Sequence, residues 1–489
     1  MAENLQKKTF SGVIWGFMEK FSVQFFAFVQ QVILARLLSP SDFGLIAMAG
    51  VFNAICYTLV DSGFASALIR KKNRTDLDFS TVFVVNVCMS LLVGAILCAC
   101  SGFIADFYHQ PILVKIVCIN GVLIVLGSFT AVQGVRLSAT MQFKLHSKIN
   151  IINSFGGGIV SIVFAILGFG VWSLVYPGFF TFALGGYLYW HYQHWFPGIQ
   201  FSKKSFRDMF SYGSKMLASG LLNTLYNNMY PLIIGKKYTS SDLGYFSKGQ
   251  TFTTLPSITM TNVLAGVSFP VLSQIQDDDE RLAHSYRRLL RLSAFVLFPV
   301  LIGMAALAKP LIIVLITAKW LPSVIYLQIL AFALMWYPIH AINLSLLQVK
   351  GRSDLFLRLE IIKKILGVSI LIFTMQISIL GMCLGIVVSS LISLYINTYY
   401  TSKLIHVTFS EQMKDLTPSL VYSVSMGGVV YFVIGLFSNA WMQLTVGIIL
   451  GACYYYLIPK ITKSQDLTYL KEIIDKNILS KTRKIETMD

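Results

Sequence analysis

The stretch VILARLLSPSDFGL, residues 32–45, decides the fold, because it returns two hundred positions later as LIIGKKYTSSDLGY, residues 232–245. In both copies an apolar segment ends in a basic residue, a short turn follows, and a new apolar segment opens with Ser-Asp-x-Gly. Repeats of this size inside a hydrophobic chain are typical of secondary transporters, whose substrate path lies between the two halves. The sequence therefore predicts a duplicated membrane protein.

The composition is that of an integral membrane protein. Of the 489 residues, 55% are hydrophobic and only 12% are charged, and the mean hydropathy is +0.69. Apolar stretches of about twenty residues, each able to cross a hydrocarbon core of roughly 30 Å, follow one another along almost the whole chain. No segment remains that would form a soluble domain.

Charged residues and Pro/Gly-marked breaks divide these stretches into about fourteen predicted spans. They cover residues 12–36, 43–69, 79–105, 112–136, 147–168, 171–191, 209–235, 245–272, 288–316, 323–348, 357–378, 380–402, 418–437 and 440–458.

The basic residues fall on alternate connections, as the positive-inside rule requires. The connection after the second span holds Arg70, Lys71 and Arg74, for example, whereas GFGVW around Gly170 holds none. The net charge of +17 is therefore a topology signal, and we expect no nucleic-acid partner. An even number of spans with both termini in the cytoplasm follows.

Six spans separate the two copies of the repeat, so the halves should enter the membrane in the same direction. We predict an all-α integral membrane protein with two parallel six-helix bundles around a central cavity, at 1–200 and 201–405. Two accessory helices at 406–460 and a cytoplasmic amphipathic tail at 461–489 should follow them. The charged segment 277–291 is expected to form a surface helix joining or preceding the ninth span.

No catalytic or metal-binding pattern is present. The nearest approach to a Walker A loop, GKK at Gly235, lacks the earlier glycine and the Ser/Thr, and neither HExxH nor GxSxG occurs. The seven cysteines lie mostly in apolar runs without metal-ligand spacing. We therefore expect neither an enzyme nor a metal site.

Polar side chains form stripes on two predicted spans, where lipid makes them costly. On the first span Glu19 shares a helical face with Gln30, and Lys20 and Gln24 lie beside it. The seventh span carries Lys215, Ser219, Asn223 and Asn227, with Tyr226 alongside. These stripes should face the cavity. The alternative is that Glu19, Lys20 and Lys215 only extend toward the cytoplasmic surface.

Asp61 on the second span and Lys248 near the outer end of the eighth are further ionisable candidates. The alternative for Asp61 is a structural role, in which it pairs with a lysine or caps a broken helix. Arg36 and Lys236 lie at the predicted outer mouth, where a solvated helix end is an equal alternative. A basic lining with few acids favours an anionic substrate, and amide and aromatic groups suit sugars. Together they suggest a phosphate-linked glycan.

Three segments resemble the polysaccharide-transporter (Wzx-type) branch of the multidrug/oligosaccharidyl-lipid/polysaccharide exporter superfamily. They are GVIWGFMEKFSVQFFAFVQQVILARLLSPSDFGLIAM from Gly12, VDSGFASALIRK from Val60, and FPVLSQIQDDDERLAHSYRRLLRLSAFVLFPVLIGMAALAKPLI from Phe269 with the later Lys319-Trp320. The similarity is distributed over nearly the whole chain. It implies two six-helix bundles around a V-shaped cavity, with two extra helices.

For function, the resemblance implies that undecaprenyl-diphosphate-linked oligosaccharides are flipped from the cytoplasmic to the periplasmic leaflet of a bacterial inner membrane by alternating access. The products would serve O-antigen, capsule or exopolysaccharide synthesis, with membrane lipids, a polysaccharide polymerase and a chain-length regulator as candidate partners. No cofactor is expected beyond a coupling ion, H⁺ or Na⁺.

These roles are assigned to the following residues. The candidate ligands of the diphosphate are Lys215, Lys20, Lys248, Arg36 and Lys236; those of the sugars are Asn223, Asn227, Tyr226, Gln24 and Gln30; those of the coupling ion are Glu19 and Asp61.

Three alternatives stay open. A lipid II flippase of the MurJ type handles the same lipid diphosphate, and a MATE-type drug or cation antiporter shares the fold but would be expected to have an acidic cavity. From another class, a membrane glycosyltransferase or polysaccharide polymerase should carry long periplasmic loops with clustered acids, histidines or arginines. None is seen.

Overall fold

The computed structural model describes residues 2–61, 63–71 and 73–472, and every regular element within these ranges is a helix. In chain order the elements are α1 (Ala2–Leu37), α2 (Pro40–Asp61), α3 (Phe64–Arg70), α4 (Asp76–Ala99), α5 (Ser101–Tyr108), α6 (Ile112–Ala139), α7 (Phe143–Ile166), η1 (Gly170–Leu174), α8 (Pro177–Gln193), α9 (Lys203–Lys237), α10 (Ser240–Gln274), α11 (Asp279–Ala306), α12 (Ala308–Ile316), η2 (Ala318–Trp320), α13 (Ser323–Leu334), α14 (Tyr337–Val349), α15 (Ser353–Thr374), α16 (Ile379–Ile405), α17 (Phe409–Ile434) and α18 (Ala440–Ile461).

The helices match the predicted spans closely. Eleven helical segments of the described chain are long and apolar enough to cross a membrane. Helices α1, α9 and α15, with 36, 35 and 22 residues, are also long enough but more polar, and they bring the number to the fourteen predicted. The prediction of an all-α membrane fold is confirmed.

Several predicted spans are two helices joined at a break, and the break after α2 has a clear cause. Gly63 adopts a left-handed backbone conformation with φ +68°. Glycine adopts this conformation readily because it lacks a Cβ atom, whereas other residues disfavour it. A Cβ on Gly63 would also lie 2.6 Å from the carbonyl oxygen of Gly213 on α9. The chain therefore turns between α2 and α3 at a point where its backbone packs closely on α9.

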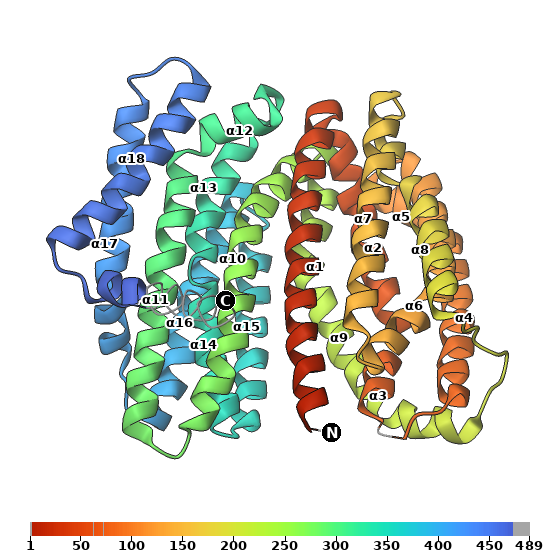
Figure 1. Ribbon diagram of the computed structural model, residues 1–489. Coiled ribbons are helices and arrows are strands. Elements are labelled where there is room, and N and C mark those ends of the chain that lie inside the picture. Colours follow the sequence, from red (N-terminus) through yellow and green to blue (C-terminus); the bar gives the residue numbers. More distant parts are fainter. Residues whose placement is uncertain (1, 62, 72, 473–489) are drawn as a thin grey trace, which may run out of the picture. The chain divides into compact units, whose positions relative to one another are not determined.

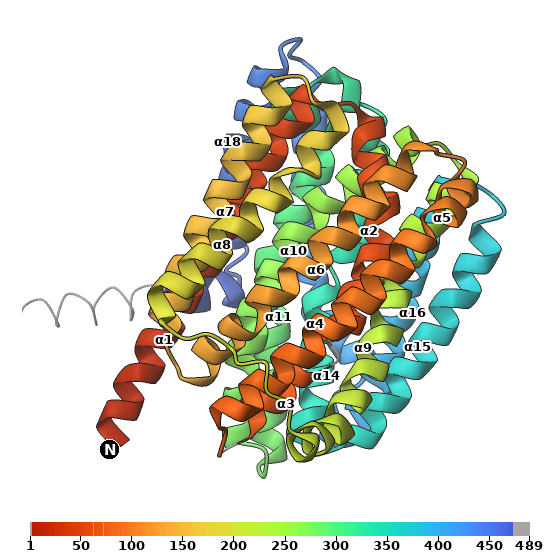
Figure 2. The ribbon, with the colours of Figure 1, turned by 90° about the vertical axis from the view of Figure 1, so that its right-hand side faces the viewer.

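The chain forms two compact units, residues 1–247 and 248–489. In the first unit α1 packs on α7, α2 on α9, α4 on α6, and α7 on α8, and the last two pairs are visible side by side in Figure 2. In the second unit α11 packs against α17, which also contacts α18 (Figure 1). The predicted domain boundaries, which rest on the sequence repeat, stay predictions, although α9 packs within the first unit.

The charged segment 277–291 joins the ninth span, which is one of the two predicted arrangements. Residues from Asp279 onward are the first turns of the continuous helix α11. In the tail, residues 465–472 form a short helix whose Leu467 is buried. The rest of the predicted amphipathic tail, 473–489, lies outside the described residues.

Candidate functional site

The two copies of the repeat build the same turn. Asp42 Oδ2 accepts hydrogen bonds from Ser39 N at 2.9 Å and Ser39 Oγ at 2.7 Å, at the start of α2. Asp242 Oδ2 accepts them from Thr239 N at 3.1 Å and Thr239 Oγ1 at 2.7 Å, at the start of α10. Such caps satisfy amide groups that the first turn of a helix leaves without partners. The repeated Ser-Asp pattern is thus a pair of identical helix starts.

The two helix starts pack directly on each other within the first unit. Ser41 Oγ lies 2.7 Å from Ser240 Oγ. A Cβ on Gly44 would lie 1.7 Å from the carbonyl oxygen of Ser240, and a Cβ on Gly244 would lie 2.0 Å from that of Pro40. The contact is reciprocal, since Pro40 and Ser240 hold equivalent positions in the repeat, and only glycine permits this backbone approach. We call these five residues the crossing.

The Glu19 carboxylate is held by α7. Its Oε2 accepts a hydrogen bond from Ser147 Oγ at 2.6 Å and its Oε1 accepts one from Asn150 Nδ2 at 2.7 Å. Asn150 Oδ1 accepts one from Tyr189 OH at 3.1 Å, and His146 Nε2 lies 3.3 Å from Asn150 Nδ2. A membrane carboxylate with this many polar partners is a built site rather than a side chain that reaches only toward water.

Sequence reasoning found Glu19 but missed its partners. His146, Ser147 and Asn150 sit in the first two turns of α7 at i, i+1 and i+4, so they form one polar patch on a helix. That spacing was visible in the sequence. Nothing in the sequence alone could assign the patch to α1 rather than to another neighbour.

The polar stripe of α9 is exposed. Lys215, Ser219, Asn223 and Asn227 recur every fourth residue and are all exposed side chains, while Tyr226 is half-buried. Lys20 and Gln24, one turn apart on α1, are exposed as well. Gln30 differs, because its Oε1 would lie 3.0 Å from a Cβ on Gly158 of α7. Five of the predicted ligands (Lys20, Gln24, Lys215, Asn223 and Asn227) are thus exposed on α1 and α9, whereas Tyr226 is half-buried and Gln30 packs on a neighbouring helix.

Asp61 and Lys215 lie at the same level of the α2–α9 contact. Asp61 is the last residue of α2 and is exposed, two residues before Gly63. A Cβ on Gly63 would lie 2.9 Å from the Cβ of Met216, which follows Lys215 directly. The turn after Asp61 therefore packs on α9 beside the residue that follows Lys215.

The other predicted bases lie elsewhere. Lys248 is only 4% exposed and its Nζ lies 5.7 Å from the centre of the Trp320 ring in the second unit. Lys236 Nζ lies 3.4 Å from His109 Nε2, and Arg36 is exposed near the end of α1. Lys236 is 21 residues beyond Lys215 on α9, which at 1.5 Å per residue is about 30 Å, the thickness of a membrane core. Lys236 and Lys215 therefore belong to opposite ends of the span.

Comparison with known proteins gives the family. The family model described as "Polysaccharide biosynthesis protein" matches residues 33–325. The teichuronic acid biosynthesis protein TuaB of Bacillus subtilis (strain 168) is 24% identical, covering 94% of this chain and 96% of its own. The lipopolysaccharide biosynthesis protein WzxC of Escherichia coli (strain K12) is also 24% identical, with 87% and 88% covered.

Solved structures share the fold. The lipid II flippase MurJ, in an inward closed conformation, superposes with a TM-score of 0.73 at 15% identity, covering 93% of this chain and 98% of its own. An inward-facing multidrug resistance MATE transporter gives a TM-score of 0.61 at 14% identity, with 78% and 95% covered. The resemblance predicted from the sequence is confirmed at the level of fold and family. The chain belongs to the polysaccharide biosynthesis protein family.

Proposed function

We propose that this chain is a flippase that moves undecaprenyl-diphosphate-linked oligosaccharides from the cytoplasmic to the periplasmic leaflet of a bacterial inner membrane, without catalysing a chemical step. The observation that carries the proposal is the stripe of Lys215, Ser219, Asn223 and Asn227, exposed on a helix long enough to span the membrane. A lysine beside amides offers a charge for phosphate and hydrogen-bonding groups for sugar hydroxyls. The names of the relatives TuaB and WzxC support a role in surface polysaccharide synthesis.

The positive-inside pattern supports an orientation with both termini in the cytoplasm. In that orientation Glu19, Lys20 and Lys215 lie toward the cytoplasmic side, and the crossing lies at the periplasmic end. Lys215 and Lys20 would bind the diphosphate on entry, and Gln24, Tyr226 and the two asparagines of the stripe would contact sugars. Opening at the crossing would then release the headgroup near Arg36 and Lys236. A polysaccharide polymerase and a chain-length regulator would use the flipped units.

Two alternatives within this fold make different demands on the site. A MATE-type cation antiporter would be served by an acidic lining, whereas the open faces of α1 and α9 carry Lys20 and Lys215. A lipid II flippase would bind the same diphosphate. The names of the relatives TuaB, WzxC and the succinoglycan biosynthesis transport protein ExoT favour surface polysaccharides over lipid II as the pathway.

The test of function is a deletion strain in which lipid-linked glycans of the cytoplasmic leaflet are extracted and identified. We expect the undecaprenyl-diphosphate-linked repeat unit of a surface polysaccharide to accumulate, while lipid II turnover and cell-wall synthesis continue. Normal glycan export in the deletion strain would remove the flippase assignment. Accumulation of lipid II instead would assign the protein to cell-wall synthesis as a lipid II flippase.

Lys215 gives the first prediction on the site. In the deletion strain, Lys215→Ala should restore about 10- to 150-fold less surface glycan than wild type, because a charged hydrogen bond to phosphate contributes about 1.5–3 kcal/mol. Lys215→Arg should restore most of it. The matched control is Lys204→Ala, which removes another exposed lysine near the start of the same helix. Full rescue by Lys215→Ala would exclude this lysine from the mechanism.

We also propose that Glu19 couples transport to protons rather than to Na⁺. Ser147 Oγ and Asn150 Nδ2 both direct hydrogens at the carboxylate, an arrangement that offers a cation few oxygen ligands. In inverted membrane vesicles, collapse of the pH gradient should slow wild-type transport by at least about tenfold, equivalent to about 1.4 kcal/mol. Transport by the Glu19→Gln variant should be slow both with and without the pH gradient. Dependence on Na⁺ in place of the pH gradient would refute the proton proposal.

A further inference from the structure

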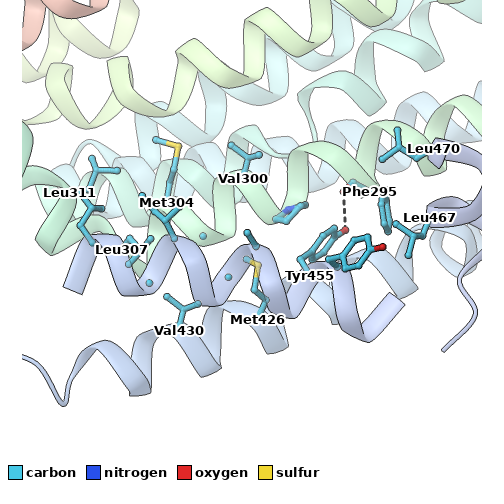
Figure 3. A pocket seen from close by; sticks show the side chains of 18 residues that line it. Phe295, Val300, Met304, Leu307, Leu311, Met426, Val430, Tyr455, Leu467 and Leu470 are labelled. Atoms are coloured by element: carbon cyan, nitrogen blue, oxygen red, sulfur yellow. Dashed lines mark hydrogen bonds between the residues drawn. The ribbon is translucent and has the colours of Figure 1, made fainter. Parts of the chain in front are cut away.

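The second unit contains an apolar cavity that none of the predicted site residues touches. It has a volume of about 520 Å³ and lies among α11, α12, α17, α18 and the short helix 465–472. Figure 3 shows Val300, Met304, Leu307, Met426 and Val430 around it. We call this cavity the slot. Its volume falls within the roughly 300–1,000 Å³ of sites that enclose small ligands.

Glycines make the slot. Gly303 and Gly451 are among its lining residues, and a Cβ on either would keep at least 3.4 Å from its nearest neighbour, so α11 and α18 leave space there that side chains would fill. The Tyr455 hydroxyl donates a hydrogen bond to the carbonyl oxygen of Phe295 at 2.9 Å, so its polar end is already satisfied (Figure 3). Apart from Tyr456 at one end, the remaining lining is apolar. An alkyl chain is the ligand that suits such a lining.

One end of the slot is basic. Tyr456 lines it, and the ammonium groups of Lys471 and Lys460 lie 5.1 and 6.0 Å from the centre of the Tyr456 ring. On the short helix that supplies Leu467 and Leu470 to the lining, the ring of Tyr469 is covered by the Arg288 guanidinium. Cations at the rim of an apolar slot are complementary to a phosphate attached to an alkyl chain.

The acids at this end leave the excess of bases intact. Asp466 Oδ1 lies 3.4 Å from Arg291 Nε, and burial raises the pKa of Asp466 while that guanidinium opposes the shift. Glu472 is exposed. Asp415, which also acts on Asp466, is paired with Arg287. Among the described residues at this end, five bases (Arg287, Arg288, Arg291, Lys460 and Lys471) therefore face three acids (Asp415, Asp466 and Glu472).

We propose that the slot is a binding site for one anionic glycerophospholipid, with an acyl chain inside it and the phosphate on Lys460 and Lys471. The short helix 465–472 covers this end through Leu467 and Leu470, so the bound lipid would tie the tail to α11 and α18. An undecaprenyl chain is more than twice as long as an acyl chain and fits a slot of about 520 Å³ less well. The inference does not depend on the proposed transport function.

Native mass spectrometry of the purified full-length protein tests the site. The protein is mixed with phosphatidylglycerol or phosphatidylcholine carrying the same acyl chains. We expect one phosphatidylglycerol to be retained by wild type at least about tenfold better than phosphatidylcholine, equivalent to about 1.4 kcal/mol. Lys460→Gln with Lys471→Gln should reduce this preference to near unity.

A second variant fills the slot. A Cβ on Gly451 would have its nearest neighbour, Val430 Cγ2, at 3.5 Å, so Gly451→Leu can place its side chain in the slot without a clash at Cβ. This variant should lose the bound lipid. Gly428→Leu on α17, where a Cβ meets nothing within 4 Å and which does not line the slot, should keep it.

Three results would overturn the proposal. The first is that Gly451→Leu retains phosphatidylglycerol. The second is that Gly428→Leu loses the lipid as fully as Gly451→Leu does. The third is that undecaprenyl phosphate displaces the lipid at equal concentration. The last would assign the slot to the tail of an isoprenyl lipid. Thermal unfolding of each variant shows that loss of lipid is not loss of fold.

Discussion

Replacing Gly44 by valine at the crossing is expected to lower glycan export by about 5- to 150-fold, because overpacking costs about 1–3 kcal/mol. The backbone carbonyl of Ser240 lies where the new Cβ would be, 1.7 Å away, and a backbone atom cannot move aside as a side-chain tip can. The starts of α2 and α10 must separate instead. If the crossing closes the periplasmic end during the transport cycle, the conformation that accepts substrate loses stability. Surface glycan in the deletion strain is the measurement.

The matched control for this prediction is Gly50→Val on the same helix. A Cβ on Gly50 would meet nothing within 4 Å, so this variant should export glycan normally. Equal loss in both variants would indicate a general effect of valine on α2 and not a role for the crossing.

A cross-link separates a conformational effect from misfolding. In a background without the native cysteines, Ser41→Cys with Ser240→Cys should form a disulfide readily, since the two hydroxyl oxygens are 2.7 Å apart. Oxidation should stop transport and a reductant should restore it, whereas neither single-cysteine variant should respond. Undiminished transport by the cross-linked protein would show that the crossing never opens.

The second large effect is expected on stability, at the ion pair between α11 and α17. Arg287 Nε and Nη2 donate to Asp415 Oδ2 and Oδ1 at 2.6 and 2.9 Å, and Asp415 is only 8% exposed. Removing one partner from a buried pair leaves a charge without compensation and costs about 3–5 kcal/mol. The Arg287 side chain is 37% exposed, so water partly solvates the charge that remains in Asp415→Leu. We therefore expect this variant to lose free energy of unfolding at the lower end of that range, about 3 kcal/mol. The thermal midpoint of the purified protein should fall by about 6–12 °C.

The double variant provides the control for this pair. Arg287→Met with Asp415→Leu removes both charges and should regain most of the lost stability, because two apolar side chains need no compensation. A double variant as unstable as Asp415→Leu alone would mean that the aspartate has another essential partner. Unchanged stability in the single variant would mean that water already solvates the pair.

The fold could be predicted from the sequence to a large extent because its main determinants are local. A helix of about twenty apolar residues is obliged to cross the membrane wherever it occurs, so the spans follow from hydropathy alone. The helix starts at Asp42 and Asp242 likewise depend on residues three positions apart. The break at Gly63 was harder to predict, since it depends on contact with Gly213 on a distant helix.

The candidate site was predicted by residue type but not by contact. The stripe on α9 follows from four-residue spacing and is exposed as expected, while Gln30, placed with the sugar ligands, packs on Gly158. Lys248, assigned to the diphosphate, is buried beside Trp320. Helical periodicity shows which residues share a face, but it does not show which neighbour that face meets.

The sequence by itself determined the membrane class, the positions of the long helices, the repeat and the two capped turns that mark it. Only the tertiary structure decided that these turns pack on each other through Gly44 and Gly244, that Glu19 binds to α7, and that a slot opens beside α18. The physical reason is that lipid and protein interior are both apolar, so hydropathy fixes a helix in the membrane without fixing its rotation. Rotation is set by close packing between residues far apart in the chain.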